Sequence, residues 1–297
     1  MTSWIALALL SGFLMAVVNM IDRYVLTRLV ERAVVPLVVL GVVGAGPGLV
    51  ILALKGSGGL SGLRLLTGLA AGLAFLAMGY FYFRAAQIEE ISRVVPLFYL
   101  SPVLVAFLAH FFLGERLSFP KYAGMFLILA GAVLLAARRS AGLRLGPAFG
   151  LMAAAAAALA AYSLATGYLL RFADFWTVFG LSRLGLFLGT IPVFLKHRRA
   201  IKSELSGRRG LKVAALMAGN EGLALAGSLF FTLAASRGPI SLVTTLASTQ
   251  PLFVFVLSLI LGVVAPRVFR EDVGLPTLAL KLGALAAMFA GMILVTS

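Results

Sequence analysis

The chain alternates between long apolar stretches and short polar connections. About 20 predominantly apolar residues are needed for an α-helix to cross the hydrocarbon core of a bilayer. Ten stretches meet or approach this length, and the longest polar connection is the basic stretch from Lys196 to Gly210. The pattern therefore predicts an all-α polytopic membrane protein with ten transmembrane helices, at 4–20, 33–54, 65–83, 94–113, 119–137, 147–168, 175–195, 213–235, 242–264 and 275–296.

The composition agrees with this prediction. Hydrophobic residues make up 62% of the 297 positions and charged residues only 12%, whereas soluble domains carry roughly 45–50% apolar and about 25% charged residues. The net charge of +15 comes from basic residues between the apolar stretches. There they suit loops beside anionic lipid better than a face for nucleic acid. We expect a multi-pass protein of the inner membrane with no nucleic-acid partner.

The scarcity of metal-binding and nucleophilic side chains limits the chemistry. The chain has no cysteine and only two histidines, so neither a thiolate metal site nor a cysteine nucleophile is expected. No basic leader precedes the first apolar stretch, which indicates a retained span. No phosphate-binding loop of the Walker type is present. We therefore expect no cofactor, no metal and no enzyme activity, since one midspan carboxylate does not make a catalytic set.

The sequence repeats itself. A shift of 149 residues aligns Ile91-Ser92 with Ile240-Ser241 and Pro102 with Pro251. A shift of 160 aligns Gly131 with Gly291, so an insertion is predicted near 264–275. Each repeat holds five spans, and an odd number inverts the second copy in the membrane. We predict two inverted five-helix repeats, 1–143 and 144–297, as in secondary transporters.

The stretch from Pro96 to Leu135 carries a family resemblance. It places Pro102 in a span, then the turn LGERLS at Leu113 to Ser118, then a glycine-containing apolar span. This order resembles the EamA branch of the drug/metabolite transporter superfamily. The second half follows the same plan but departs from it at the turn, where Val264-Ala265-Pro266-Arg267 stands. The resemblance implies a ten-helix basket with a central cavity and alternating access, and it names no cargo.

Two ionisable residues lie deep within predicted spans: Arg183 in the seventh and Glu221 in the eighth. A charge in the membrane is costly, so such residues face a cavity or a partner. One interpretation makes Glu221 a proton-coupling carboxylate and Arg183 an anchor for a substrate carboxylate or phosphate. The other is an Arg–Glu pair that holds two helices together. Asp22 is expected at the membrane interface.

Polar residues at helical spacing mark further candidates. The fourth and ninth spans are repeat mates and are expected to face each other across the cavity, with Pro102 and Pro251 kinking them. Ordinary interhelical hydrogen bonding is the alternative for each polar residue. The candidate substrate-binding residues are Arg183, Asn220, Gln250, Tyr99, Asn19, Tyr162 and Ser248, and His110 joins Glu221 as a proton-coupling candidate.

The charge distribution predicts an orientation. The odd-numbered connections hold 17 Lys and Arg, and the even-numbered connections with the termini hold 6. The positive-inside rule then places the odd connections in the cytoplasm and both termini outside, whereas many relatives in the superfamily are thought to have both termini inside. The predicted function is a secondary transporter of a small metabolite, acting as a monomer or homodimer among membrane lipids. The alternatives are a flippase for a lipid-linked phosphorylated metabolite and a non-transporting scaffold or receptor.

Overall fold

The computed structural model describes residues 3–56, 59–88, 98–136, 147–264 and 275–296. These residues contain no strand, which confirms the all-α prediction. Seven segments among them are long and apolar enough to cross a membrane, and three shorter apolar helices accompany them. The helices are α1 (Ser3–Arg28), α2 (Val34–Lys55), α3 (Gly62–Ile88), α5 (Leu100–Phe112), α6 (Phe119–Ala136), α7 (Pro147–Leu169), α8 (Phe175–Leu205), α9 (Gly207–Ala235), α10 (Ile240–Ala247), α11 (Gln250–Val264) and α12 (Leu275–Thr296).

The predicted ninth span is two helices rather than one. Helix α10 ends at Ala247 and α11 begins at Gln250. Pro251 has no N–H to donate, and a proline ring collides with the carbonyl four residues earlier, here that of Ala247. This carbonyl lies against α1, where a Cβ added to Gly12 would sit 2.8 Å from the Ala247 oxygen. At the predicted kink the helix is interrupted just before Pro251.

The kink predicted at Pro102 stays a prediction. Pro102 lies in the first turn of α5, which begins at Leu100. A proline fits there without bending the helix because the first N–H groups of a helix have no partner within it. The beginning of the predicted fourth span, at 94–97, and most of the insertion predicted near 264–275 lie outside the described residues.

The basic stretch from Lys196 to Gly210 is helical, contrary to the expected connection. Helix α8 runs on to Leu205, and α9 begins at Gly207. Only Ser206 separates them, in an extended conformation, and Gly207 takes a positive φ of 74°. Glycine adopts such a φ without steric penalty, so the chain reverses within two residues. The two helices carry their basic side chains beyond the apolar part of the bundle.

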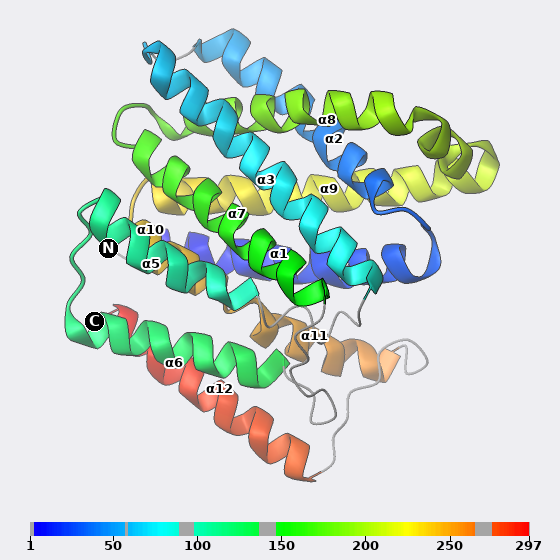
Figure 1. Cartoon of the computed structure of the whole chain (residues 1–297). Helices are drawn as coiled ribbons and strands as arrows, with labels where there is room; N and C mark the ends of the chain where they lie inside the picture. The colour runs from blue at the N-terminus through cyan, green and yellow to red at the C-terminus, as the bar shows by residue number, and fades with distance from the viewer. Residues whose placement is uncertain (1–2, 57–58, 89–97, 137–146, 265–274, 297) are drawn as a thin grey trace.

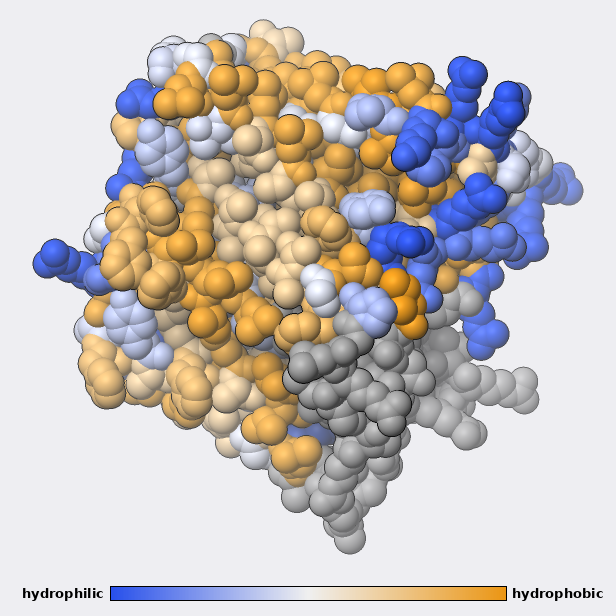
Figure 2. All heavy atoms as spheres, in the orientation of Figure 1, coloured by the Kyte–Doolittle hydropathy of each residue, from blue (hydrophilic) through white to orange (hydrophobic). Residues whose placement is uncertain are grey.

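The helices run antiparallel between two ends of the molecule (Figure 1). The end that holds both termini, the terminal end, also holds Glu115, which binds the beginning of α10. The opposite end, the basic end, holds the α8–α9 junction. There Arg32 pairs with Glu204 at 3.9 Å, and Gln87 donates to the Glu31 carbonyl at 2.8 Å. Figure 2 shows apolar side chains over most of the visible face and hydrophilic ones gathered at the basic end.

Helices from the two halves of the chain pack in pairs. Helix α1 packs on α9, α3 on α7 and α8, α2 on α8, and α6 on α12. Glycines permit the closest approaches, because they let helix backbones come together. A Cβ on Gly72 of α3 would sit 2.0 Å from the Ser182 carbonyl oxygen, and one on Gly185 of α8 would sit 2.1 Å from that of Leu69. Gly222, in contrast, has no atom within 4 Å of its Cβ position.

Candidate functional site: a cavity between the two halves

A cavity of about 200 Å³ lies at the centre of the bundle. The helices that line it are those of the first, third, fourth, sixth, eighth and ninth predicted spans, joined by one residue of α2. The fourth and ninth spans, expected from the repeat pattern to border the cavity, are among these walls. The lining residues are Ser11, Met15, Val18, Asn19, Asp22, Leu40, Phe75, Met78, Gly79, Tyr82, Phe83, Phe98, Tyr99, Leu159, Tyr162, Ser163, Glu221, Ala224, Ser228, Phe231, Thr244, Ala247, Ser248 and Gln250.

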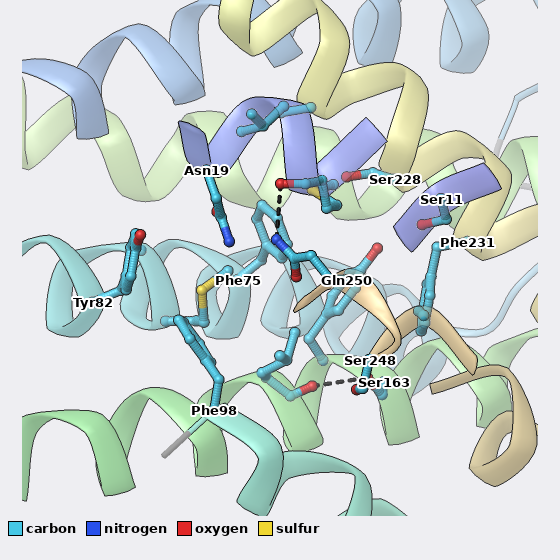
Figure 3. Close-up of a pocket in the computed structure, with 18 of the residues that line it drawn as sticks. Ser11, Asn19, Phe75, Tyr82, Phe98, Ser163, Ser228, Phe231, Ser248 and Gln250 are labelled. Carbon is cyan, nitrogen blue, oxygen red and sulfur yellow. Dashed lines mark hydrogen bonds between the residues drawn. The ribbon is translucent and has the colours of Figure 1, made fainter. Parts of the chain in front are cut away.

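Six of the predicted site residues line this cavity. They come from four helices, from the turn before α5 and from the break between α10 and α11, and their roles there remain predictions. In Figure 3 the Asn19 and Gln250 side chains lie close to the middle of the pocket, with Ser248 and Ser163 on another wall. The six are Asn19, Tyr99, Tyr162, Glu221, Ser248 and Gln250.

The break between α10 and α11 forms part of the cavity wall. Gln250 donates from Nε2 to the Met15 carbonyl at 2.8 Å, which ties the start of α11 to α1 (Figure 3). Ser248 donates to the Thr244 carbonyl at 2.9 Å, within the last turn of α10. Irregular backbone is tolerated inside a membrane where it lines a cavity, and interrupted helices form the substrate sites of many transporters.

Aromatic rings form a second wall. The ring centroids of Phe75 and Tyr162 are 5.0 Å apart, and those of Tyr162 and Phe231 are 6.1 Å apart. The three residues belong to α3, α7 and α9, so the aromatic row spans both halves of the chain. Tyr162 is only 3% exposed, and its hydroxyl has no hydrogen-bond partner among the described residues. The cavity thus combines a broad apolar surface with a few polar groups, as small-molecule sites do.

Arg183 lies outside the lining of the cavity. It is 2% exposed and packs against α2, where a Cβ on Gly48 would sit 2.8 Å from the Arg183 Cβ. Its guanidinium lies 4.9 Å from the centroid of the Phe75 ring and 5.0 Å from that of Phe179. Arg183 thus does not line the cavity, and its predicted role as a substrate anchor stays a prediction.

The alternative of a direct Arg183–Glu221 pair does not hold either. Among the described residues the one ion pair within 4.0 Å joins Arg32 and Glu204. Glu221 interacts electrostatically with Arg183 across a longer distance, and two guanidinium nitrogens of Arg183 have no hydrogen-bond partner in the described part of the chain. The buried guanidinium of Arg183 therefore contacts aromatic rings and no carboxylate.

Asp22 is the cavity residue that sequence reasoning missed. It is 8% exposed, lines the cavity, and accepts a hydrogen bond from Asn220 Nδ2 at 2.7 Å. The expected interfacial position is wrong because α1 continues to Arg28, well past the predicted end at residue 20. The signal was the helical spacing of Ser11, Met15, Asn19 and Asp22, which form one face of α1.

Two other predicted residues lie away from the lining. Asn220 stands behind the cavity and reaches it only through its bond to Asp22. His110 is exposed at the end of α5, with Nδ1 3.0 Å from the Glu115 carbonyl oxygen. His110 therefore does not line the cavity, and its proton-coupling role stays a prediction. No group of three or more potential metal ligands occurs among the described residues.

Three comparisons relate the chain to known proteins. Residues 2–137 match the EamA-like transporter family, which confirms the resemblance carried by the turn at Leu113 to Ser118. A Sinorhizobium sp protein named "Uncharacterized transporter in cobO 3'region" is 46% identical over 71 residues, 24% of this chain. The match spans about half of that relative, 48% of its length. A solved structure described as "Crystal structure of protein" covers 99% of this chain and 96% of its own, with a TM-score of 0.73 and 22% identity.

Proposed function

We propose that this membrane protein, which matches the EamA-like transporter family over residues 2–137, is a secondary transporter of a small polar organic solute. It works by alternating access in the inner membrane. The observation that carries the proposal is the central cavity, because helices of both halves line it and buried polar groups of both halves face it. A scaffold has no need of such a cavity.

The packing of the helices supports two inverted repeats, 1–143 and 144–297. In the repeat α1 corresponds to α7, α2 to α8, α3 to α9, α5 to α10 with α11, and α6 to α12. If each helix is replaced by its counterpart in the other half, the α1–α9 contact becomes α7–α3, and the α5–α7 contact becomes α10–α1. All four of these contacts occur in the structure. The α2–α8 and α6–α12 contacts exchange with themselves. Rocking of such repeats about a shared cavity is the usual basis of alternating access.

We assign the coupling role to Glu221. Its carboxylate is 6% exposed and lines the cavity from the middle of α9. An ionised carboxylate is costly at membrane depth, and binding of a proton or another cation removes that cost. Loading and release of a cation at Glu221 would thereby bias which side of the cavity is open.

The flippase alternative receives less support. A phosphorylated headgroup calls for Arg, Lys or helix N-termini at its oxygens. No lysine, arginine or histidine lines the cavity among the described residues, and Arg183 stands outside it. A soluble cargo therefore fits the lining better than a lipid-linked phosphate does.

The test is uptake into proteoliposomes that contain the purified protein. Pools of amino acids, amines, sugars and nucleosides are offered with and without a proton gradient. We expect gradient-driven accumulation of at least one pool, and loss of this accumulation in Glu221→Gln. Equal transport by wild type and Glu221→Gln would remove Glu221 from the coupling role. The absence of transport for every soluble pool would contradict the proposed function.

A further inference from the structure

The polar groups that face the cavity are unbalanced in charge. Two carboxylates, Asp22 and Glu221, line it, and no basic side chain does so among the described residues. The buried guanidinium of Arg183 lies outside the lining, 4.9 Å from the centroid of the Phe75 ring. The described surface of the cavity is therefore acidic.

The two carboxylates differ in how they are held. Asp22 is fixed by the 2.7 Å hydrogen bond from Asn220, so its position is set by the packing of α1 on α9. Glu221 makes no hydrogen bond or contact ion pair with any described residue. Glu221 follows Asn220 in the chain, and the charges of Asp22 and Arg183 both act on it. One anchored acceptor on α1 and one acceptor without a hydrogen bond on α9 thus line the same cavity.

Two buried polar oxygens at or behind the cavity wall also have no partner. The Tyr162 hydroxyl, on a residue of the aromatic row, and the Asn220 carboxamide oxygen, behind Asp22, are both unpaired in the described structure, and their side chains are 3% and 4% exposed. A buried polar atom without a partner costs about 1–3 kcal/mol, so such atoms point to a missing ligand. An ammonium group offers up to three donors and no acceptor, which is what this set of acceptors lacks.

The opposite part of the cavity suits an apolar body. The rings of Phe75, Tyr162 and Phe231 form a continuous row, and Figure 3 shows Phe98 on the facing side. Aromatic faces attract cations as well as apolar groups. A ligand with a positive head and an aromatic or aliphatic body would satisfy both parts of the lining.

We infer that the cavity binds a small organic ammonium, with the charged nitrogen between Asp22 and Glu221 and the apolar body against the aromatic row. The inference rests on the proposed function for the view that this cavity is the substrate site. It excludes free carboxylates and phosphates as substrates, because they would place an anion beside two carboxylates.

The test is equilibrium binding to the purified full chain in detergent, measured by calorimetry. The probes are 2-phenylethylammonium, 2-phenylethanol and 3-phenylpropionate, which share a ring and differ in charge. We expect the ammonium to bind and the other two to bind at least about tenfold more weakly. Asp22→Asn and Glu221→Gln should each weaken ammonium binding about tenfold or more. Asp174→Asn, a substitution of a carboxylate outside the cavity, should leave binding unchanged.

A second measurement needs no variant, which guards against misfolding of the substituted chains. Wild-type protein is treated with a hydrophobic carbodiimide, and modified carboxyls are mapped by mass spectrometry. We expect the ammonium probe, and not the alcohol, to protect Glu221. Equal or tighter binding of the carboxylate probe, or absence of both ammonium binding and protection, overturns the inference. Ammonium binding without transport in proteoliposomes would contradict the proposed function alone, whereas transport of other solutes without ammonium binding would contradict this inference alone.

Discussion

Asp174 shows how a single side chain begins a helix. Its carboxylate accepts hydrogen bonds from the N–H groups of Trp176 at 2.8 Å and Thr177 at 3.1 Å at the start of α8. Partial burial alone would raise its pKa, but the bonds from Thr177 and Trp176 and the charge of Lys55 outweigh it and hold the pKa below its ordinary value of 3.8. A depressed folded pKa stabilises the protein above the ordinary value and loses that stabilisation as the pH falls through the folded value.

We therefore expect Asp174→Ala to lower the stability by about 1 kcal/mol near neutral pH. The difference between the variant and wild type should shrink below about pH 4, where the carboxyl gains its proton. The measurement is thermal unfolding in detergent at several pH values. Asp174→Asn is the control, because asparagine also caps helices. A difference that stays constant from neutral to acidic pH would count against the capping role.

Glu115 connects the two halves through its carboxylate. Oε1 accepts the Ile240 N–H at 2.7 Å, and Oε2 accepts the Ser241 N–H at 3.2 Å and the Ser241 hydroxyl. The turn that presents it needs Gly114 at a φ of 63°. Because a partly buried carboxylate satisfies the open N–H groups of α10, Glu115→Ala should lower the stability by about 1–2 kcal/mol. Glu115→Gln keeps one acceptor oxygen and should lose less. Thermal unfolding that ranks the glutamine variant below the alanine variant would refute this account.

At the scale of the element, hydropathy predicted which segments are helical and failed where a specific residue ends or extends a helix. The ninth span is uniformly apolar, so its break at Pro251 is invisible to a hydropathy window. The basic stretch after Lys196 is polar yet helical, because it extends past the apolar bundle as part of α8. Asp22 was predicted at the membrane interface because the apolar stretch stops shortly before its charge. In the structure α1 continues past Asp22, and Asp22 lines the cavity.

The close approach of α3 and α8 depends on the absence of a side chain at Gly72. A Cβ there would collide with the Ser182 carbonyl oxygen at 2.0 Å. Backbone cannot rotate away as a side chain can, so Gly72→Ala should destabilise the protein by about 1–3 kcal/mol. Gly222→Ala is the matched control within α9, where the Cβ position is open. It should be neutral or stabilising by up to about 1 kcal/mol, since alanine favours helix. Detergent unfolding of the two variants tests the difference, and equal loss in both would contradict close packing at Gly72.

At the scale of the whole molecule, we expect the basic end and the terminal end to lie on opposite sides of the membrane. The α8–α9 junction carries the largest group of basic residues, with Lys202, Arg208 and Arg209 around Ser206. Because cytoplasmic loops are enriched in Lys and Arg, we expect this end to face the cytoplasm and both termini to face outward. The chain has no cysteine, so single cysteines can report on each end without background.

Ser206→Cys and Ser236→Cys form a matched pair for this purpose. Both serines are exposed and follow the last residue of a helix, and they lie at opposite ends of α9. A membrane-impermeant maleimide added to intact cells should label Ser236→Cys, and it should label Ser206→Cys only after the membrane is permeabilised. The reverse pattern would place the basic end outside and both termini in the cytoplasm, which would set this chain against the positive-inside rule. Labelling of both sites in intact cells would mean that the protein inserts in two orientations.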